Sequence, residues 1–318
     1  MKKVFYVFFA IGIVLFSCKG DDSGSADLVT VLGRNGNVLV KWINGREVSI
    51  PTDDDFYQFT SGYYRGNDLY VSVCRIKDGV YDLYYWKNDT RVSLPSDRTR
   101  ATTSIYASGD DVFTTGIQNN GELGVFWKND NPATVLFHTG SSRAYAITGS
   151  GSDIYIGGRD NKEAVVWKNG QQSILPSVGN SSAYAIAVSG TDVYVGGTEN
   201  NDYIPVYWKN GTKNILPLAA GATEARVSSI FVSGTDVYLA GYQMKDGDFY
   251  ASYWKNGQLT TLTKKSFAYS IFVKGSDVFV AGTTYNDVTR FPAYWKNGEV
   301  VSLSASSGRG EAVFINVK

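Results

Sequence analysis

Arginine side chains recur near two points of a repeated pattern, and they are the residues best suited to bind a ligand. Arg34, Arg75 and Arg159 occupy corresponding positions, where another copy has Tyr242, and Arg100, Arg143, Arg226 and Arg309 lie shortly before the next copy begins. A guanidinium group can bind a carboxylate or a sulfate through two parallel hydrogen bonds. These residues predict a site for an acidic glycan or protein tail. The alternative is pairing with neighbouring acids such as Asp160, Glu163, Glu224 and Glu311.

Catalytic and metal-binding motifs are sparse. The chain has one histidine, His138, and no Walker-type phosphate loop, H-E-x-x-H or G-x-S-x-G motif, so we expect no cofactor and no metal centre. The acidic stretches at 53–55 and 246–248 do not fit an EF-hand loop, and solvated loops explain them better than calcium. Cys74 lies in an apolar run and is expected to be a small buried side chain. An extracellular glycan hydrolase or lyase that uses loop carboxylates stays open as the enzymatic alternative.

An internal repeat positions all of these residues. The seven tryptophans occur in one phrase, such as VYWKNG at 206–211, and are 40 to 46 residues apart. A second phrase, such as GTDVY at 190–194, contains an aspartate that recurs every 39 to 44 residues. These aspartates are Asp27, Asp68, Asp111, Asp153, Asp192, Asp236 and Asp277. Two markers in step predict seven copies of one structural unit.

Each copy reads as four short strands. In the copy at 181–217, apolar β-prone segments alternate with turn residues, and no window has the 3.6-residue period of a helix. Four strands in 40–45 residues are typical of a β-propeller blade. Asn-Gly after the Trp-Lys pair predicts a type I′ turn between the third and fourth strands. The Gly-x-Asp sequence predicts the turn between the first and second strands, where it accounts for the aspartates better than seven acidic sites do.

The order of the strands follows from small residues and from the ends of the repeat. The first strand of a copy carries small side chains, as at Ala183 and Ala185, which suit the narrow centre of a propeller. The chain ends with such a strand, at 312–317, whereas residue 27 begins with a second strand. We therefore predict an all-β, seven-bladed propeller whose C-terminal strand completes the N-terminal blade and removes free sheet edges. The alternative places the second strand innermost, with no shared blade.

The repeated order A-Y-A-I-x-V-S-G, V-Y-V-G-G and Y-W-K-N-G resembles the HAF-type extracellular propeller repeats over residues 27–318. The resemblance implies the propeller fold and little about chemistry. Kelch repeats share the glycine pair but separate the Tyr and Trp that are adjacent here.

The two faces of the propeller are expected to differ. The segments between aspartate and tryptophan are 14 to 18 residues long, and those from tryptophan to the next aspartate are 23 to 28 residues long. The first kind of segment contains the loop between the second and third strands, and the second kind contains the connection to the next copy. Both loops are expected on the same face, and binding is usually found where loops vary on a rigid scaffold. The lysines after the tryptophans should ring the opposite face, either solvated or against anionic lipid. The tryptophans should pack between blades, with sugar stacking as the alternative.

The N-terminus predicts export. Lys2 and Lys3 precede an apolar run at 4–16, and the following Ser17-Cys18 completes LFSC, which resembles a bacterial lipobox. We predict a signal peptide at 1–17, a lipidated Cys18 with a flexible tether at 18–26, and the propeller at 27–318. A plain cleaved secretory signal is the alternative.

Composition and charge narrow the partners. Thirty basic and thirty acidic side chains cancel, and 43% of residues are apolar, which is typical of a folded protein without a general attraction to nucleic acid. The combined expectation is a monomeric outer-membrane lipoprotein of a Gram-negative bacterium. We expect it to bind a polysaccharide or a protein at the cell surface; a purely structural role in an envelope complex is a third hypothesis.

Overall fold

The computed structural model describes residues 27–50, 56–77, 80–95, 99–118, 122–201, 203–305 and 308–318. The predicted signal peptide, Cys18 and the tether at 18–26 lie outside these residues, as do the acidic residues 53–55.

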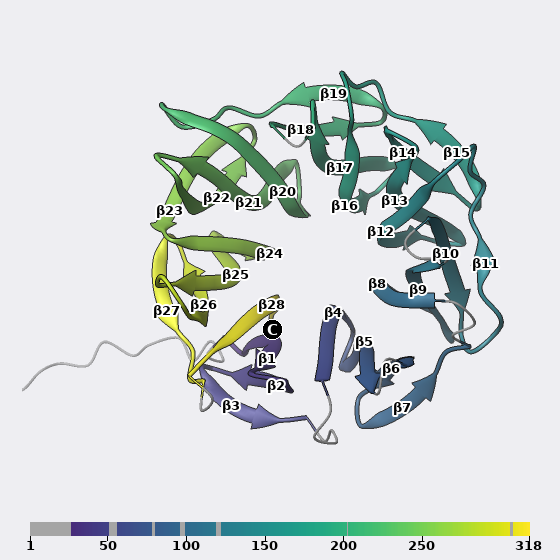
Figure 1. The fold of residues 1–318 in the computed structure, drawn as a ribbon, viewed down its shortest axis with the longest axis horizontal. Helices are drawn as coiled ribbons and strands as arrows, with labels where there is room; N and C mark the ends of the chain where they lie inside the picture. Colours follow the sequence, from purple (N-terminus) through teal and green to yellow (C-terminus); the bar gives the residue numbers. More distant parts are fainter. Residues whose placement is uncertain are drawn as a thin grey trace, which may run out of the picture.

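Seven four-stranded antiparallel sheets form a closed ring (Figure 1). From the axis outward, blade 1 is β28 (Gly310–Val317), β1 (Val29–Asn35), β2 (Val38–Ile43) and β3 (Arg46–Ser49); blade 2 is β4 (Phe56–Arg65), β5 (Asp68–Lys77), β6 (Val80–Lys87) and β7 (Thr90–Ser93); blade 3 is β8 (Thr99–Ser108), β9 (Asp111–Gln118), β10 (Leu123–Lys128) and β11 (Thr134–Val135). Blade 4 is β12 (Ser142–Ser150), β13 (Asp153–Asp160), β14 (Glu163–Lys168) and β15 (Gln171–Ile174); blade 5 is β16 (Ser182–Ser189), β17 (Asp192–Glu199), β18 (Ile204–Lys209) and β19 (Thr212–Ile215). Blade 6 is β20 (Ala222–Ser233), β21 (Asp236–Lys245), β22 (Asp248–Lys255) and β23 (Gln258–Lys264); blade 7 is β24 (Ser266–Lys274), β25 (Asp277–Tyr285), β26 (Arg290–Lys296) and β27 (Glu299–Ser302). The predicted fold and the closure of blade 1 by β28 are confirmed.

The turns between outer strands have the predicted geometry wherever the sequence is Asn-Gly. Asn210 and Gly211 both have positive φ, at 50° and 80°, as a type I′ turn requires. Asn88 and Asn129 also have positive φ, but Asp89 and Asp130 after them do not. The difference arises because aspartate, unlike glycine, has a Cβ that disfavours the left-handed region.

A β-bulge interrupts the innermost strand of every blade, a feature that the sequence did not predict. In blade 5 the register moves from Ala183 opposite Gly197 to Ala185 opposite Gly196, which leaves Tyr184 as the extra residue. A Cβ at Gly197 would lie 2.0 Å from the carbonyl oxygen of Ser182, so only glycine fits beside the bulged strand. The small residues that flank Tyr184 therefore mark a bulge as well as a narrow axis.

The tryptophans pack between blades, as predicted. Trp208 is fully buried in a cluster with Leu175 of blade 4 and Ile186 of its own blade. Its indole N–H donates a 2.8 Å hydrogen bond to the carbonyl oxygen of Pro176, in the connection from blade 4. Trp127, Trp167 and Trp254 make the same contact with Pro95, Phe137 and Pro217. Each of these four indoles thus ties its blade to the preceding one.

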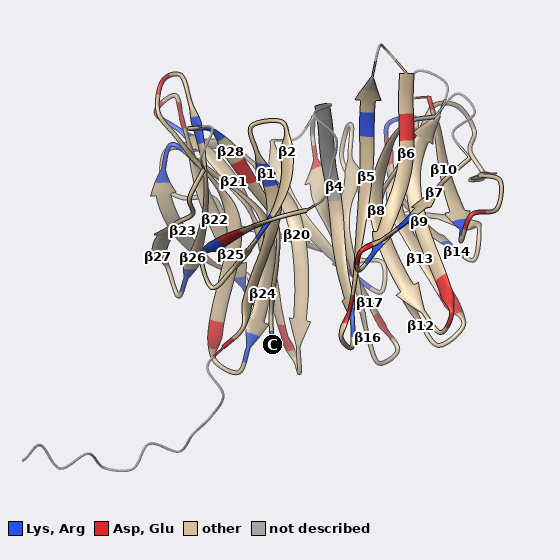
Figure 2. Cartoon of the chain, turned by 90° about the horizontal axis from the view of Figure 1, so that it is seen from below, with Lys and Arg blue, Asp and Glu red and all other residues tan. Residues whose placement is uncertain are grey.

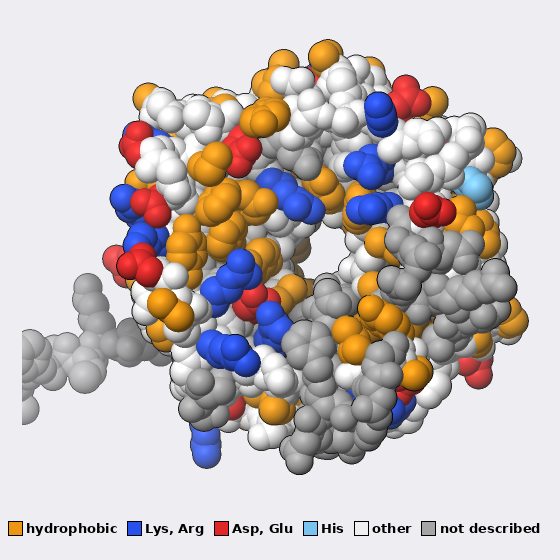
Figure 3. All heavy atoms as spheres, viewed as in Figure 1, with side chains coloured by type: hydrophobic (Ala, Val, Ile, Leu, Met, Phe, Trp, Pro, Cys, Tyr) orange, Lys and Arg blue, Asp and Glu red, His pale blue; other side chains and the backbone are white. Residues whose placement is uncertain are grey.

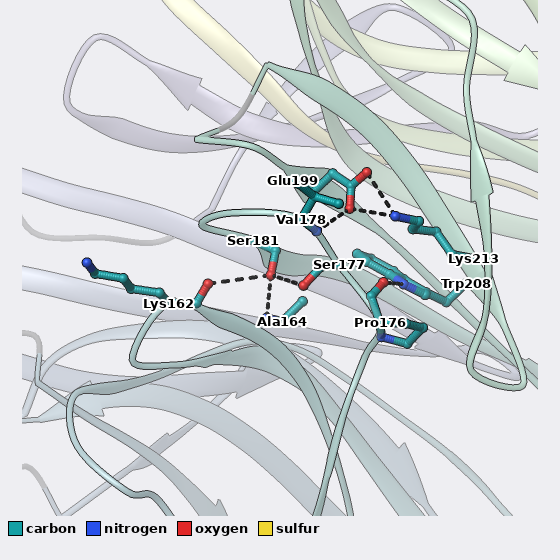
Figure 4. A network of polar contacts seen from close by, with 9 residues as sticks. All are labelled: Lys162, Ala164, Pro176, Ser177, Val178, Ser181, Glu199, Trp208 and Lys213. Carbon is teal, nitrogen blue, oxygen red and sulfur yellow. Dashed lines mark hydrogen bonds and ion pairs between the residues drawn. The ribbon is translucent and has the colours of Figure 1, made fainter.

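Buried polar groups hold the same connections (Figure 4). The Glu199 carboxylate, only 2% exposed, accepts a 2.7 Å hydrogen bond from the backbone N–H of Val178 and pairs with Lys213 at 3.0 Å. The Ser181 hydroxyl accepts a 2.8 Å hydrogen bond from the backbone N–H of Ala164 and donates one of 3.5 Å to the carbonyl oxygen of Lys162. Asp160 in blade 4 accepts hydrogen bonds from the backbone and hydroxyl of Thr139 at 2.9 Å. These contacts fix where the variable loops begin.

The face that carries the hairpin turns is uniform and internally neutralised. In Figure 2 these turns form the lower edge of the ring, where acidic and basic residues gather. Asp153 accepts a hydrogen bond from the Asn169 amide at 2.7 Å and pairs with Lys168 at 2.7 Å, and this lysine lies 5.2 Å from the ring centre of Tyr155. The repeat aspartates of blades 2 to 7 all pair with the lysine of their own blade, at 2.7 to 3.9 Å. The repeated lysines are thus paired components of the turns.

We expect folding stability to decline below about pH 4 because of these pairs. Lys168 and Asn169 lower the pKa of Asp153 below its ordinary value of 3.8, and Lys209 and Asn210 do the same to the pKa of Asp192. A lowered pKa in the folded state stabilises the fold above the ordinary pKa, and the contribution disappears as the pH falls through the lowered value. Calorimetry between about pH 7 and pH 2 should show a smaller loss of Tm in Asp153→Asn/Asp192→Asn than in wild type. Equal losses would contradict this assignment.

Candidate functional site

The axial channel opens on the face that carries the variable loops. It has a volume of about 460 Å³ and is lined by the innermost strands of all seven blades. The bulge residues line it, among them Thr103, Tyr145, Tyr184, Ser228, Tyr269 and Val313. Burial, and then the nearby Glu311 carboxylate, raise the pKa of Tyr269 to about 12, so its phenol stays neutral at any physiological pH. The wall is therefore a neutral surface of hydroxyls and apolar groups.

Arginines occupy the rim of this channel over blades 4 to 6. Arg143 on β12 lies directly opposite Arg159 on β13, so the two side chains share one face of the sheet. Arg226 on β20 lies opposite Tyr242 on β21, and its guanidinium carbon is 4.0 Å from the ring centre of Tyr184. Like charges opposite each other destabilise a sheet. The rim therefore brings basic side chains close together, an arrangement that suits a ligand with negative charge.

A second basic site lies on the same face, where blade 7 meets blade 1. Arg34, Arg290 and Arg309 line a hollow of about 340 Å³ together with Glu311. The Glu311 carboxylate is paired with Arg34 at 3.2 Å and with Arg290 at 2.7 Å. The described lining thus carries three guanidinium groups and one carboxylate. The alternative of pairing with neighbouring acids is realised for Arg34, but the hollow keeps an excess of positive charge.

Arg75 does not share the position of Arg34 and Arg159. In blade 2 the residue that corresponds to Arg159 is Cys74, because Cys74 lies opposite Gln58 as Arg159 lies opposite Arg143 in blade 4. Arg75 is therefore one residue further along its strand. Its side chain projects from the other face of the sheet, because side chains alternate along a strand. There it pairs with Asp82 at 2.7 Å, and Arg91 pairs with the same carboxylate at 2.6 Å.

The remaining predicted residues are placed as follows. Tyr242 lies on the variable face, in contact with aromatic rings of blades 6 and 7. Arg309 directly precedes β28 and lines the hollow. Arg100 lies in β8, and its side chain is outside the described residues, as is Cys18. The structure therefore brings together Arg143, Arg159 and Arg226 on one side of the mouth, and Arg34 and Arg309 on the other.

Four residues of this face were missed from the sequence. Arg290, Phe249, Phe267 and Tyr285 lie beside the predicted residues and form an aromatic and basic surface. They belong to no repeated phrase, since they stand at the ends of strands next to loops of unequal length. Only the variability of those loops pointed to the region.

Other reactive groups have structural settings. Burial, and then Asp82, raise the pKa of Cys74 to about 12, as expected for an inert thiol in the core. Asp248, from the acidic stretch at 246–248, is paired with Lys264 at 2.9 Å. Within the described residues, no group of three or more His, Cys, Asp or Glu side chains is arranged to hold a metal ion. The described part of the chain also contains no helix that is long and apolar enough to cross a membrane.

Comparison with known proteins supports the fold. No protein-family model matches the chain, and no curated protein sequence matches it significantly. A chain in the crystal structure of a nidogen/laminin complex is similar in structure, with a TM-score of 0.50, 10% identity, and coverage of 91% of this chain and 98% of that one. The structure of YjhT gives a TM-score of 0.46 at 12% identity, covering 80% of this chain and 99% of that one. At 10% identity the first similarity concerns the fold alone, in agreement with the seven-bladed β-propeller of this chain, and shows nothing of its ligand.

Proposed function

We propose that the protein is a surface-anchored lipoprotein whose propeller binds an anionic polymer, without catalysis, at the mouth of its variable face. The observation that carries the proposal is the basic rim, with Arg143 opposite Arg159 and Arg226 held over Tyr184. On the opposite face the repeated lysines are components of the turns, where they pair with aspartates of their own blades. Figure 3 shows basic side chains around the opening of the variable face. An acidic partner is the ligand that a rim of arginines favours, because guanidinium groups bind carboxylates and sulfates with matching geometry.

The described carboxylates favour binding over hydrolysis. Of the described residues that line the channel and the hollow, Glu311 is the one carboxylate, and it is paired with two arginines. Glycosidases of the retaining and inverting types use two carboxyl groups. A binding protein therefore accounts for the mouth with fewer assumptions than an enzyme does.

The anchor at Cys18, an outer-membrane location and membership of the HAF-type repeat group are parts of this proposal. They rest on the lipobox-like LFSC and on the repeat phrases. Replacement Cys18→Ser should move the protein from the membrane fraction to the soluble fraction and abolish labelling with palmitate. Unchanged labelling would refute the anchor.

The binding site can be tested with charge-matched variants. Arg143→Gln/Arg159→Gln/Arg226→Gln should weaken the binding of an acidic polysaccharide by at least roughly 10-fold, because the loss of even one well-formed charge-assisted hydrogen bond costs about 1.5–3 kcal/mol. The control Lys128→Gln/Lys168→Gln/Lys209→Gln removes the same charge from the opposite face and should change affinity little. Titration calorimetry at two salt concentrations, on the chain without residues 1–18, measures both. Equal losses in the two triple variants would indicate attraction by net charge alone.

A further inference from the structure

An aromatic cluster on the variable face adjoins the arginine-lined hollow. It consists of Tyr242 near the end of β21, Phe249 on β22, Phe267 on β24 and Tyr285 at the end of β25. All four side chains are half-buried, and they lie apart from the inter-blade cores that surround the tryptophans. Figure 3 shows a hydrophobic patch beside the opening on this face. We refer to these four residues as the aromatic platform.

The rings of the platform are arranged around Phe267. Phe249 and Tyr285 lie 4.8 and 5.5 Å from Phe267 between ring centres, with interplanar angles of 38° and 24°. Tyr242 is nearly perpendicular to Phe267, at 4.9 Å and 87°. Tyr285 is thus close to parallel with Phe267, Phe249 is tilted against it, and Tyr242 stands at their side. Such a surface matches a flat, rigid group that is apolar on one face, because aromatic rings combine a large contact area with little conformational entropy.

Arg290 joins the platform to the hollow. Its guanidinium carbon lies 5.4 Å from the ring centre of Phe267, within the range of a cation–π contact. The same guanidinium binds Glu311 at 2.7 Å, and Arg34 and Arg309 line the hollow beyond it. The described lining has a formal charge of +2, from three arginines and one glutamate. An apolar ring surface and an excess of positive charge therefore lie side by side.

We propose that this combined surface is a subsite for a uronic acid residue of an acidic polysaccharide. The C–H face of the pyranose packs against the part of the aromatic platform that stays exposed, and the carboxylate binds Arg290 at the entrance of the hollow. The inference rests on the proposed function, since it names the class of anionic polymer that the mouth binds. An acidic peptide offers carboxylates without a rigid apolar face. A uronate has both in one residue, which is why the surface favours it.

The test uses the chain from residue 19, which contains the whole closed ring of blades. Oligogalacturonate, its carboxyl-reduced neutral counterpart and poly-L-glutamate are titrated against wild type and two variants. Phe249→Leu/Tyr285→Leu removes ring surface but keeps apolar bulk, and Arg290→Gln removes the bridging charge. Phe137→Leu, which changes a side chain 61% exposed on the connection into blade 4, is the matched control. The Tm of each variant confirms folding.

We expect wild type to bind oligogalacturonate at least about 10-fold more tightly than the other two ligands. The carboxyl-reduced counterpart has no charge, and poly-L-glutamate has no sugar ring. Phe249→Leu/Tyr285→Leu and Arg290→Gln should each lose about 10-fold in affinity for oligogalacturonate, and Phe137→Leu should lose none. Unchanged affinity in both of the first two variants, with binding still dependent on Arg143, Arg159 and Arg226, would overturn the subsite and leave the proposed function intact. Equal or tighter binding of poly-L-glutamate would overturn the uronate assignment. Binding of no anionic polymer would overturn both proposals.

Discussion

Deletion of residues 310–318 is expected to abolish cooperative folding. These residues form β28, which pairs with β1 from Val29 opposite Val317 to Asn35 opposite Gly310. Ala312, Ile315 and Val317 are buried in the core between blades 7 and 1, together with Trp42 and Phe279. The loss of the strand removes this packing and exposes the inner edge of β1. An exposed edge with apolar neighbours promotes aggregation, and the lost stability is on the order of the 5–15 kcal/mol that holds a typical domain together.

A connected variant provides the control for this deletion. Residues 308–318 are moved ahead of Asp27 and joined to it by a single glycine, so that Gly-Asp27 forms a two-residue turn between Lys318 and Leu28, as Gly275-Ser276 does between Lys274 and Asp277. Leu28 and Lys318 already exchange backbone hydrogen bonds of 2.9 and 3.1 Å, so this hairpin needs no rearrangement of the strands. Denaturation with guanidinium and size-exclusion chromatography should show one sharp transition and a monomer for this variant, and a broad transition with aggregates for the deletion. A monomeric deletion variant with an unchanged midpoint would disprove the role of β28.

Replacement Trp208→Ala is expected to be the most damaging single substitution of a side chain in blade 5. The indole is fully buried, and its removal leaves a cavity against Leu175 and Ile186. Loss of a buried Trp typically costs about 3–5 kcal/mol. The carbonyl of Pro176 also loses its indole donor, which adds the cost of an unpaired polar group.

The expected loss corresponds to a fall in Tm of roughly 5–8 °C for a chain of this size. Trp208→Phe keeps an aromatic ring without the N–H donor and should fall between wild type and the alanine variant. Tyr203→Ala, which removes an aromatic side chain that is 47% exposed, should change stability by less than about 0.5 kcal/mol. Differential scanning calorimetry measures all three. Similar Tm values for Trp208→Ala and Tyr203→Ala would show that the indole does not lock the blades.

Spacing alone predicted most of the scaffold because a blade is a local unit. Strands that pair within a blade are separated by short turns, and the Asn-Gly sequence determines the geometry of its turn whatever surrounds it. The closure was predictable as well, since the last segment of the repeat, at 312–317, has the pattern of an innermost strand and the first segment, from residue 27, has the pattern of a second strand. The bulge was not predictable, because it depends on how two backbones align and not on the residue types alone.

The candidate site was predictable only in part. The rim arginines Arg143, Arg159 and Arg226 follow the repeat, so their convergence on the mouth follows from the order of the strands. Arg75 was misplaced because a shift of one residue along a strand moves a side chain to the other face of the sheet.

The sequence by itself determined the number of blades, the hairpin turns, the shared blade and the face on which loops vary. Only the tertiary structure decided what that face presents to a ligand. Arg34 and Glu311 are 277 residues apart in the chain and meet through the closure of the ring. Phe249 and Phe267 come from neighbouring blades and contact each other 4.8 Å apart. The repeated turn residues are positioned by interactions within one blade, whereas these two contacts depend on the closure of the ring and on the packing of neighbouring blades.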